Sequence, residues 1–285
     1  MNLIINTGKT GYPGLRLEVC LIAGSINLAP IVFLHEGLGS VSMWTQRGLD
    51  WPQAVCHATG RAGVVYSRRG YGQSEPAART LESTDHPTLL KPDYMHHEAW
   101  DILPALLHQL QLQLQHQNLD EFPCFKNPVL LGHSVGATIA LLYASRHPAS
   151  ACIAMAPHVC VEEVSIESIR KARLAFESGD LRDRLARHHA DVDGAFWQWN
   201  DVWLSKAFNS PGGFDIRPEC GKITAPLLLI QGVNDAYGTL QQLDDIALVA
   251  PHAQQIRLDD CGHSPQRDQP EKTIQAISDF LKNTG

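Results

Sequence analysis

The 285-residue chain has no long apolar run. None of its stretches reaches the roughly 18 consecutive apolar residues that suggest a membrane-spanning helix. The first residues, MNLIINTGKTGYPG, also lack the basic start and long apolar stretch of a signal peptide. With 44% hydrophobic and 19% charged residues, the composition is that of an ordinary soluble globular protein. We therefore expect a cytoplasmic protein without a membrane partner.

An excess of positive charge is missing as well. Lys and Arg total 23 residues and Asp and Glu total 30, which gives a net charge of −7 with the two signs interleaved. A mildly acidic protein is poorly suited to the phosphate backbone of a nucleic acid or to an anionic membrane surface. The charge balance therefore argues against both as the main partner.

The chain contains no C-x-x-C pair. Its cysteines number seven, an odd count, and several lie inside apolar runs. This pattern indicates buried, reduced thiols in a cytoplasmic protein rather than a disulfide framework. The cysteines are Cys20, Cys56, Cys124, Cys152, Cys160, Cys220 and Cys261.

Histidines are abundant, 14 in all, but their spacing does not indicate a metal site. The doublets at 96–97 and 188–189 are poor chelates, because neighbours on a helix do not share a face. His97 and Asp101 are four residues apart and could share one, but two ligands do not make a metal site. The glycine-rich segment RRGYGQS at 68–74 lacks the G-K-[ST] of a phosphate-binding loop. We expect no metal and no cofactor.

Short apolar runs alternate with longer helical patterns. Alternation of this kind predicts an α/β fold with a mostly parallel, doubly wound sheet that is covered on both faces. The predicted strands are 15–23, 30–35, 63–67, 129–132, 151–156, 226–231 and 255–258, and the predicted helices are 93–110, 135–146, 239–249 and 270–281.

One stretch breaks the alternation. Residues 161–222 are helix-like, charged and rich in aromatic residues, with no convincing strand. We interpret them as a helical insertion into a catalytic domain that comprises residues 1–160 and 223–285.

The motif Gly132-His133-Ser134-Val135-Gly136 fits G-x-S-x-G. It follows an apolar strand directly and precedes an apolar helix, which is the context that a nucleophile elbow requires. A serine on such a sharp turn projects its hydroxyl above the sheet, and its neighbours must be small. The helix N-terminus behind it stabilises developing negative charge.

A serine nucleophile needs a base, and the base needs an orienting acid. Asp235 follows the strand at 226–231, and His263 follows the last strand. Both therefore lie at the carboxyl ends of strands, where the chemistry of parallel sheets gathers. Ser134, Asp235 and His263 are the predicted triad. Asp259 and Asp260 are alternative acids, but a short loop would have to fold back to bring either to the imidazole.

An oxyanion hole should complete the site. One backbone N–H is expected from Val135, the residue after the nucleophile, and the other from the loop after an early strand. That loop is HEGLGS at 35–40, where two glycines let the backbone turn back. We favour the N–H of Gly37, with Leu38 as the alternative.

The segments FLHEGLGS, SRRGYGQS, GHSVG and CGHSPQRDQP, together with Asp235, resemble the α/β-hydrolase superfamily over residues 15–283. The chain is most similar to esterase-type members with a helical lid, of the valacyclovir hydrolase and enol-lactonase kinds. This resemblance implies that residues 161–222 form a cap over the active site.

Two positions depart from the superfamily pattern. Glu36 stands where a glycine is usual, and its carboxylate would oppose an oxyanion unless the side chain points away. Ser67 stands where an aspartate usually opens the turn.

The predicted activity is hydrolysis of a carboxylic ester, lactone or thioester of a small to medium-sized molecule through an acyl-enzyme. Cleavage of a carbon–carbon bond in a diketone would use the same triad, and so would a haloperoxidase-like activity. Haloalkane dehalogenases and epoxide hydrolases carry Asp at the nucleophile position, so Ser134 argues against both. A ligand-binding homologue without catalysis is a further alternative.

Aromatic residues recur within the predicted cap. Phe196, Trp199 and Trp203 are three and four residues apart and so share one helix face, whereas Trp197 points elsewhere. This stripe could anchor the cap to the catalytic domain or line a substrate pocket, which is typically apolar and aromatic. We expect Trp199 or Trp203 to belong to the pocket.

Overall fold

The computed structural model describes residues 2–5, 14–76, 90–116, 122–210 and 212–284. Residues 6–13 of the N-terminal segment discussed above lie outside the described residues. None of the described helices is long and apolar enough to span a bilayer.

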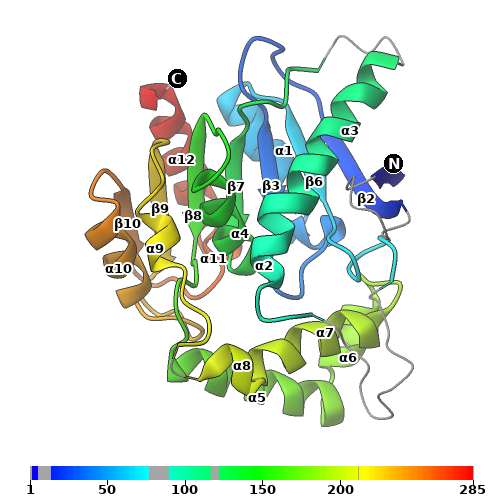
Figure 1. Cartoon of the computed structure of the whole chain (residues 1–285), viewed down its shortest axis with the longest axis vertical. Coiled ribbons are helices and arrows are strands. Elements are labelled where there is room, and N and C mark those ends of the chain that lie inside the picture. Colours follow the sequence, from blue (N-terminus) through cyan, green and yellow to red (C-terminus); the bar gives the residue numbers. More distant parts are fainter. Residues whose placement is uncertain (1, 6–13, 77–89, 117–121, 211, 285) are drawn as a thin grey trace.

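A sheet of eight strands forms the centre of the molecule, in the order β1-β2-β6-β3-β7-β8-β9-β10 (Figure 1). β1 and β2 run antiparallel to their neighbours, whereas the other six strands, β6-β3-β7-β8-β9-β10 in sheet order, are parallel to one another. The predicted α/β class with a mostly parallel sheet is therefore confirmed. The strands are β1 (Asn2–Ile5), β2 (Leu15–Ile22), β3 (Ile31–Leu34), β6 (Gly63–Tyr66), β7 (Val129–His133), β8 (Ala151–Met155), β9 (Leu227–Gly232) and β10 (Gln254–Leu258).

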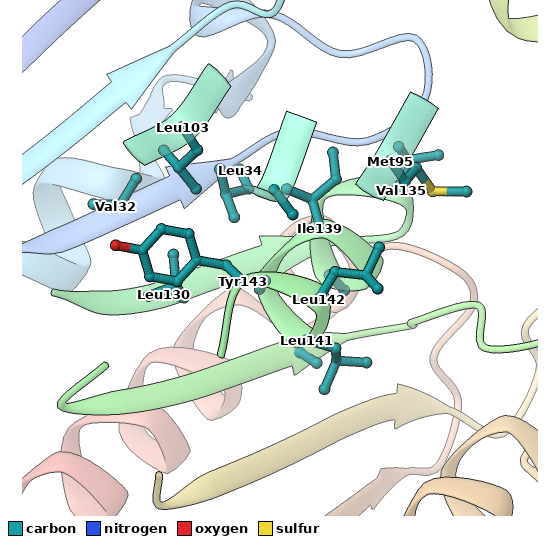
Figure 2. Packing of buried hydrophobic residues seen from close by; sticks show 14 of the residues in the cluster. Val32, Leu34, Met95, Leu103, Leu130, Val135, Ile139, Leu141, Leu142 and Tyr143 are labelled. Carbon is teal, nitrogen blue, oxygen red and sulfur yellow. The ribbon is translucent and has the colours of Figure 1, made fainter. Parts of the chain in front are cut away.

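Helices cover both faces of the sheet, as a doubly wound fold requires. Alternate residues of each strand point to opposite faces. In β3, Ile31 and Phe33 join the apolar cluster beneath α1 (Trp51–Thr59) and α12 (Pro270–Thr284). Val32 and Leu34 join the cluster on the other face (Figure 2). That face is covered by α2 (Tyr94–His97), a π-helical turn (Glu98–Ile102), α3 (Leu103–His116), α4 (Val135–Ala144) and α10 (Gln241–Val249).

Several short elements were not predicted. These are β1, α1, the hairpin of β4 (Thr45–Gln46) and β5 (Leu49–Asp50), the 3₁₀ turn η1 (Val41–Trp44) and α11 (Pro265–Asp268). Helix α1 starts with an Asp50 cap and a proline in its first turn and ends at Gly60 in left-handed conformation. These are ordinary helix signals, but they bound only nine residues.

The segment between β8 and β9 is helical. It contains α5 (Glu163–Ser178), α6 (Leu181–Ala186), α7 (Val192–Leu204), α8 (Lys206–Asn209) and α9 (Arg217–Cys220). In Figure 1, α5 to α8 lie together beyond one end of the sheet, whereas α9 lies beside β9. Residue 211 lies outside the described residues.

All seven cysteines are free thiols. The prediction that they are buried is wrong for Cys20 and Cys124, which are exposed, and Cys160 is only partly buried. Cys20 lies on the outward face of β2, where alternate residues point away from the core.

Candidate active site

Ser134 occupies the turn between β7 and α4. Its backbone angles are φ 54° and ψ −120°, a conformation that residues with a side chain rarely adopt. The Ser134 N–H donates to the carbonyl of Met155 on the neighbouring strand at 2.9 Å. Backbone strain of this kind persists only where the surrounding structure enforces it, and it is concentrated at functional sites.

The two glycines of the motif are required by close backbone packing. A Cβ at Gly132 would lie 2.1 Å from the carbonyl oxygen of Gly136. A Cβ at Gly136 would lie 1.9 Å from the carbonyl oxygen of Leu34. Both distances are far below van der Waals contact, so the strand-to-helix turn can form only with glycine at both positions.

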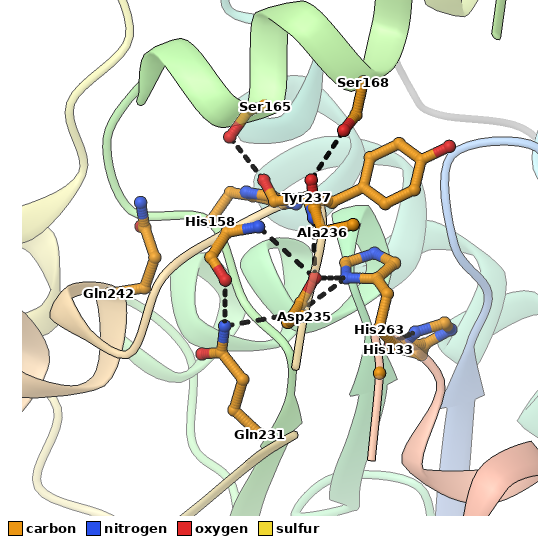
Figure 3. Close-up of polar contacts among 12 residues, drawn as sticks. His133, His158, Ser165, Ser168, Gln231, Asp235, Ala236, Tyr237, Gln242 and His263 are labelled. Carbon is orange, nitrogen blue, oxygen red and sulfur yellow. Dashed lines mark hydrogen bonds and ion pairs between the residues drawn. The ribbon is translucent and has the colours of Figure 1, made fainter. Parts of the chain in front are cut away.

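Asp235 and His263 form a direct pair (Figure 3). The imidazole Nδ1 lies 2.9 and 2.8 Å from the two carboxylate oxygens, and the Asp235 side chain is 1% exposed. The backbone N–H of Tyr237 (2.7 Å) and the side-chain amide of Gln231 (3.2 Å) also donate to the carboxylate. Burial by itself raises the pKa of Asp235, but the hydrogen bond and charge of His263 outweigh it and lower the pKa overall.

Asp259 and Asp260 are not placed to orient the imidazole. Both are exposed just beyond the end of β10, and among the described residues the carboxylate that hydrogen-bonds to His263 is that of Asp235. The structure thus brings Asp235, and not its two alternatives, to the histidine.

Two serines of α5 tie this helix to the Asp235 loop. The Ser165 hydroxyl donates to the carbonyl of Tyr237 at 2.5 Å, and the Ser168 hydroxyl donates to that of Ala236 at 2.6 Å (Figure 3). The helical segment is therefore hydrogen-bonded to the loop that carries Asp235.

The loop after β3 lies against α7. A Cβ at Gly37 would lie 2.3 Å from the indole nitrogen of Trp199, so only glycine fits beneath this ring. His189, in the linker before α7, accepts the N–H of Gly72 at its Nδ1 (3.0 Å). Its Nε2 must therefore carry the proton, which it donates to the carbonyl of Leu38 at 2.9 Å.

The Glu36 side chain is held by His133, the last residue of the neighbouring strand β7. Its carboxylate lies 2.8 Å from Nδ1 of His133, and the Nε2 of His133 lies 2.6 Å from the backbone carbonyl of His263. Burial raises the pKa of Glu36, but the charge and hydrogen bond of His133 outweigh it and lower the pKa to about 2. The Glu36 carboxylate thus contacts His133 and through it the His263 loop, a link that the sequence did not indicate.

The Ser67 side chain is hydrogen-bonded to a carboxylate of another strand. Its hydroxyl accepts the N–H of Val41 (2.9 Å) and donates to Glu18 of β2 (2.7 Å). The same Glu18 oxygen accepts the N–H of Gln73 at 3.0 Å. Ser67 and Glu18 together therefore hold the turn where the superfamily pattern has an aspartate.

Ser134 and His263 line one cavity of about 280 Å³. Its wall combines loop residues of the sheet end with side chains of α5, α6 and α7, including both Trp199 and Trp203. Most of the wall is apolar, as is typical of small-molecule pockets. Apolar and aromatic lining residues are Leu38, Met43, Val135, Ile169, Leu181, Leu185, Trp199, Trp203 and Tyr237.

The two tryptophans differ in their surroundings. Trp203 is 1% exposed, packs on Phe208 and Phe214, and donates its indole N–H to the Tyr94 hydroxyl at 3.2 Å. Trp199 is 6% exposed and lies over Gly37. Trp203 thus also joins the helical segment to α2 of the sheet domain.

His97 and Asp101 meet on their helix, with 2.7 Å between Nδ1 and Oδ2. The described part of the chain holds no group of three His, Cys, Asp or Glu side chains placed to bind a metal ion.

Three buried histidines surround the site in neutral form. Burial lowers the pKa of His158 to about 3 and that of His189 to about 4. Burial and the nearby charge of Arg68 lower the pKa of His35 well below its usual range. In the unfolded chain each would titrate near ~6.5. Below this pH the unfolded chain binds more protons than the folded one, so stability is lost as the pH falls.

We expect the free energy of unfolding to fall by about 3 kcal/mol between pH 6.5 and 5.5, about 1 kcal/mol for each of these histidines. Urea unfolding at half-unit pH steps measures this loss. His189→Gln can keep both hydrogen bonds without titrating, so it should remove about a third of the pH dependence. Equal pH dependence in the variant and the wild type would contradict the assignment.

A six-stranded parallel region with a strained serine after one central strand, and an Asp–His pair after two others, defines an α/β-hydrolase fold. The sequence model of the alpha/beta hydrolase family matches residues 31–276, so the chain belongs to this family.

Several proteins similar to this chain are named as hydrolases. The chain is 25% identical to the mouse (Mus musculus) sn-1-specific diacylglycerol lipase ABHD11, over 94% of the chain and 85% of that protein. The enol-lactonase of Burkholderia xenovorans superposes with a TM-score of 0.69 at 19% identity, covering 99% of this chain and all of that one. A thermophilic esterase from Thermogutta terrifontis gives a TM-score of 0.65 at 17% identity, covering 100% and 99%. The two structures show the shared fold, and the family supports a hydrolase.

Proposed function

We propose that the protein is a serine hydrolase that cleaves a carboxylic ester, lactone or thioester of a small to medium-sized molecule through an acyl-enzyme. One observation carries the proposal: a strained serine and a histidine bound to a buried carboxylate line the same apolar cavity. The lipase, lactonase and esterase named above act on bonds of this kind, which supports the substrate class.

Each group has a role in this mechanism. His263 takes the proton of the Ser134 hydroxyl while the serine oxygen bonds to the substrate carbonyl carbon. Asp235, bound at Nδ1, orients the imidazole and stabilises its charged form. His263 then protonates the leaving alkoxide or thiolate. Water, activated by the same histidine, attacks the acyl-enzyme and releases the acid.

The tetrahedral oxyanion would bind two backbone N–H groups. Val135 is the first residue of α4, so its N–H has no partner within the helix. Gly37, in the loop after β3, lines the same cavity as Val135. We also propose that residues 161–222 form a cap on a catalytic domain of residues 1–160 and 223–285, because α5, α6 and α7 supply much of the cavity wall.

A substrate panel tests the proposal. Purified protein would be assayed with p-nitrophenyl esters from acetate to decanoate, with lactones, with acyl thioesters and with a diketone. We expect turnover of one of the first three classes, with a pre-steady-state burst of p-nitrophenol from the esters. Turnover of the diketone alone would instead support the carbon–carbon hydrolase, and binding without turnover of any class would support a non-catalytic homologue.

The position of Trp199 predicts a change in acyl preference. Replacing it by alanine opens space beside Gly37, so we expect the ratio of kcat/KM for octanoate to that for butyrate to rise by roughly 10-fold. Trp197→Ala is the matched control, because Trp197 is equally buried but does not line the cavity.

Both truncations should lower the thermal midpoint, since losing a buried aromatic ring costs about 3–5 kcal/mol. Only Trp199→Ala should alter the ratio. An unchanged ratio in this variant would show that Trp199 only anchors the cap.

A further inference from the structure

Arg68 is a buried arginine that binds the loop carrying Gly37. It is 4% exposed and lies two residues beyond the end of β6, beside the end of β3. Its Nη1 donates to the carbonyl of His35 at 2.5 Å, and its Nη2 donates to the carbonyl of Glu36 at 2.8 Å. The guanidinium carbon also lies 4.9 Å from the centre of the Tyr71 ring. One planar cation thus binds two successive carbonyls of the loop.

The Glu36 carbonyl receives two further donors. His35 accepts the N–H of Arg68 at Nε2 (3.0 Å), so its Nδ1 carries the proton and donates to Glu36 at 2.7 Å. The N–H of Gly39 donates to the same oxygen at 3.1 Å. This carbonyl is therefore fixed in direction by one charged and two neutral donors.

The direction of the Glu36 carbonyl determines the direction of the next N–H. The Glu36 carbonyl and the Gly37 N–H belong to one planar trans peptide, in which the two groups point in opposite directions. Donors that hold the carbonyl on the Arg68 side therefore aim the Gly37 N–H away from Arg68. Gly37 lines the cavity, and its N–H has no hydrogen-bond partner among the described residues.

We propose that Arg68 is a positioning residue for the oxyanion hole: it locks and polarises the Glu36–Gly37 peptide so that the Gly37 N–H receives the oxyanion. This inference rests on the proposed serine hydrolase function. A donor bound to the carbonyl of a peptide makes the N–H of that peptide a stronger donor. The positive charge behind the peptide also favours negative charge in front of it.

Arginine suits this role better than lysine. Its rigid fork of N–H groups spans two acceptors at once, whereas an ammonium is a single point of charge on a flexible stem. Arg68→Lys therefore keeps the charge but loosens the peptide, and Arg68→Gln removes the charge as well.

A second buried arginine offers a matched control. Arg61 is 6% exposed and donates to the carbonyl of Ala29 at 2.9 Å, before the start of β6 and so at the opposite end of this strand. Arg61→Lys perturbs a similar arginine–carbonyl contact without touching the Gly37 loop. It should lower stability without a specific effect on turnover.

The test compares wild type, Arg68→Lys, Arg68→Gln and Arg61→Lys, each confirmed as folded by thermal unfolding. We would measure kcat and KM for p-nitrophenyl butyrate and the affinity for an alkyl boronic acid, which forms a tetrahedral adduct with the serine. Loss of one oxyanion donor lowers kcat by about 10²–10³-fold, so a misaimed donor should cost roughly 10–100-fold. We expect Arg68→Lys to show this loss in kcat with KM nearly unchanged, Arg68→Gln to show at least as much, and boronate affinity to fall by the same factor.

A purely structural role predicts a different result. Unchanged kcat in folded Arg68→Lys, or a rise in KM without a fall in kcat, would overturn the inference. If Arg68→Gln fails to fold, Arg68→Lys decides by itself. Labelling of wild type with a fluorophosphonate separates this failure from that of the proposed function. Absence of label on Ser134 refutes the hydrolase, whereas label on Ser134 with wild-type kcat in Arg68→Lys refutes only the role of Arg68.

Discussion

Replacing Ser134 by alanine is expected to lower kcat for ester hydrolysis by about 10⁴-fold or more, because the attacking oxygen is lost. The variant should fold normally, since the change removes one hydroxyl and leaves the turn as it is. Steady-state kinetics and fluorophosphonate labelling, followed by peptide mapping, would measure both effects. Label at any residue other than Ser134 in the wild type would refute the assignment of the nucleophile.

A glycine at the same position provides a control that separates strain from chemistry. With φ 54° and ψ −120°, the Ser134 backbone is in a region that glycine adopts freely. Ser134→Gly should be as inactive as Ser134→Ala but more stable than the wild type by roughly 1–3 kcal/mol, the usual cost of such strain. Equal stability of the two variants would show that the turn holds little strain.

Asp235→Asn is expected to lower kcat by about 10³–10⁴-fold with a small change in KM. An amide of the same shape no longer stabilises the imidazolium or favours the tautomer with the proton on Nδ1. The substitution also replaces one of the two acceptor oxygens of Asp235, which receive hydrogen bonds from His263 and Gln231, by an NH₂ group that cannot accept them. Kinetics on p-nitrophenyl butyrate would measure the loss.

The chain itself offers matched controls for this substitution. Asp259→Asn and Asp260→Asn change exposed carboxylates that are close in sequence to His263, whereas the imidazole is hydrogen-bonded to Asp235. Each should keep kcat within about twofold, as surface substitutions usually do. A larger loss in Asp260→Asn than in Asp235→Asn would require a different orienting acid.

The fold was predictable because its signals are local. Continuous apolar runs such as VLLG at 129–132 indicate strands buried on both faces, and the alternation with helices indicates a parallel sheet. The G-x-S-x-G motif lies where a predicted strand meets a predicted helix, so the sequence alone shows its context. The unpredicted elements β1, β4, β5 and α11 have at most four residues each, too few to show a period.

Arg68 and His133 had no comparable signal. In the sequence, Arg68 is one of two arginines in a glycine-rich turn, and His133 fills a variable position of the motif. Glu36 could only be identified as a carboxylate in an unusual place. Its partner is 97 residues away along the chain, and no spacing rule connects them.

The sequence by itself determined the types and order of the elements and which residues carry reactive groups, because these depend on near neighbours and on side-chain chemistry. Only the tertiary structure decided which charges meet. The strand order β6-β3-β7 places the ends of three strands side by side, so that Arg68 binds the backbone of the Gly37 loop and His133 binds Glu36. Side-chain directions at those ends follow from sheet register and close packing, which join residues far apart in the chain.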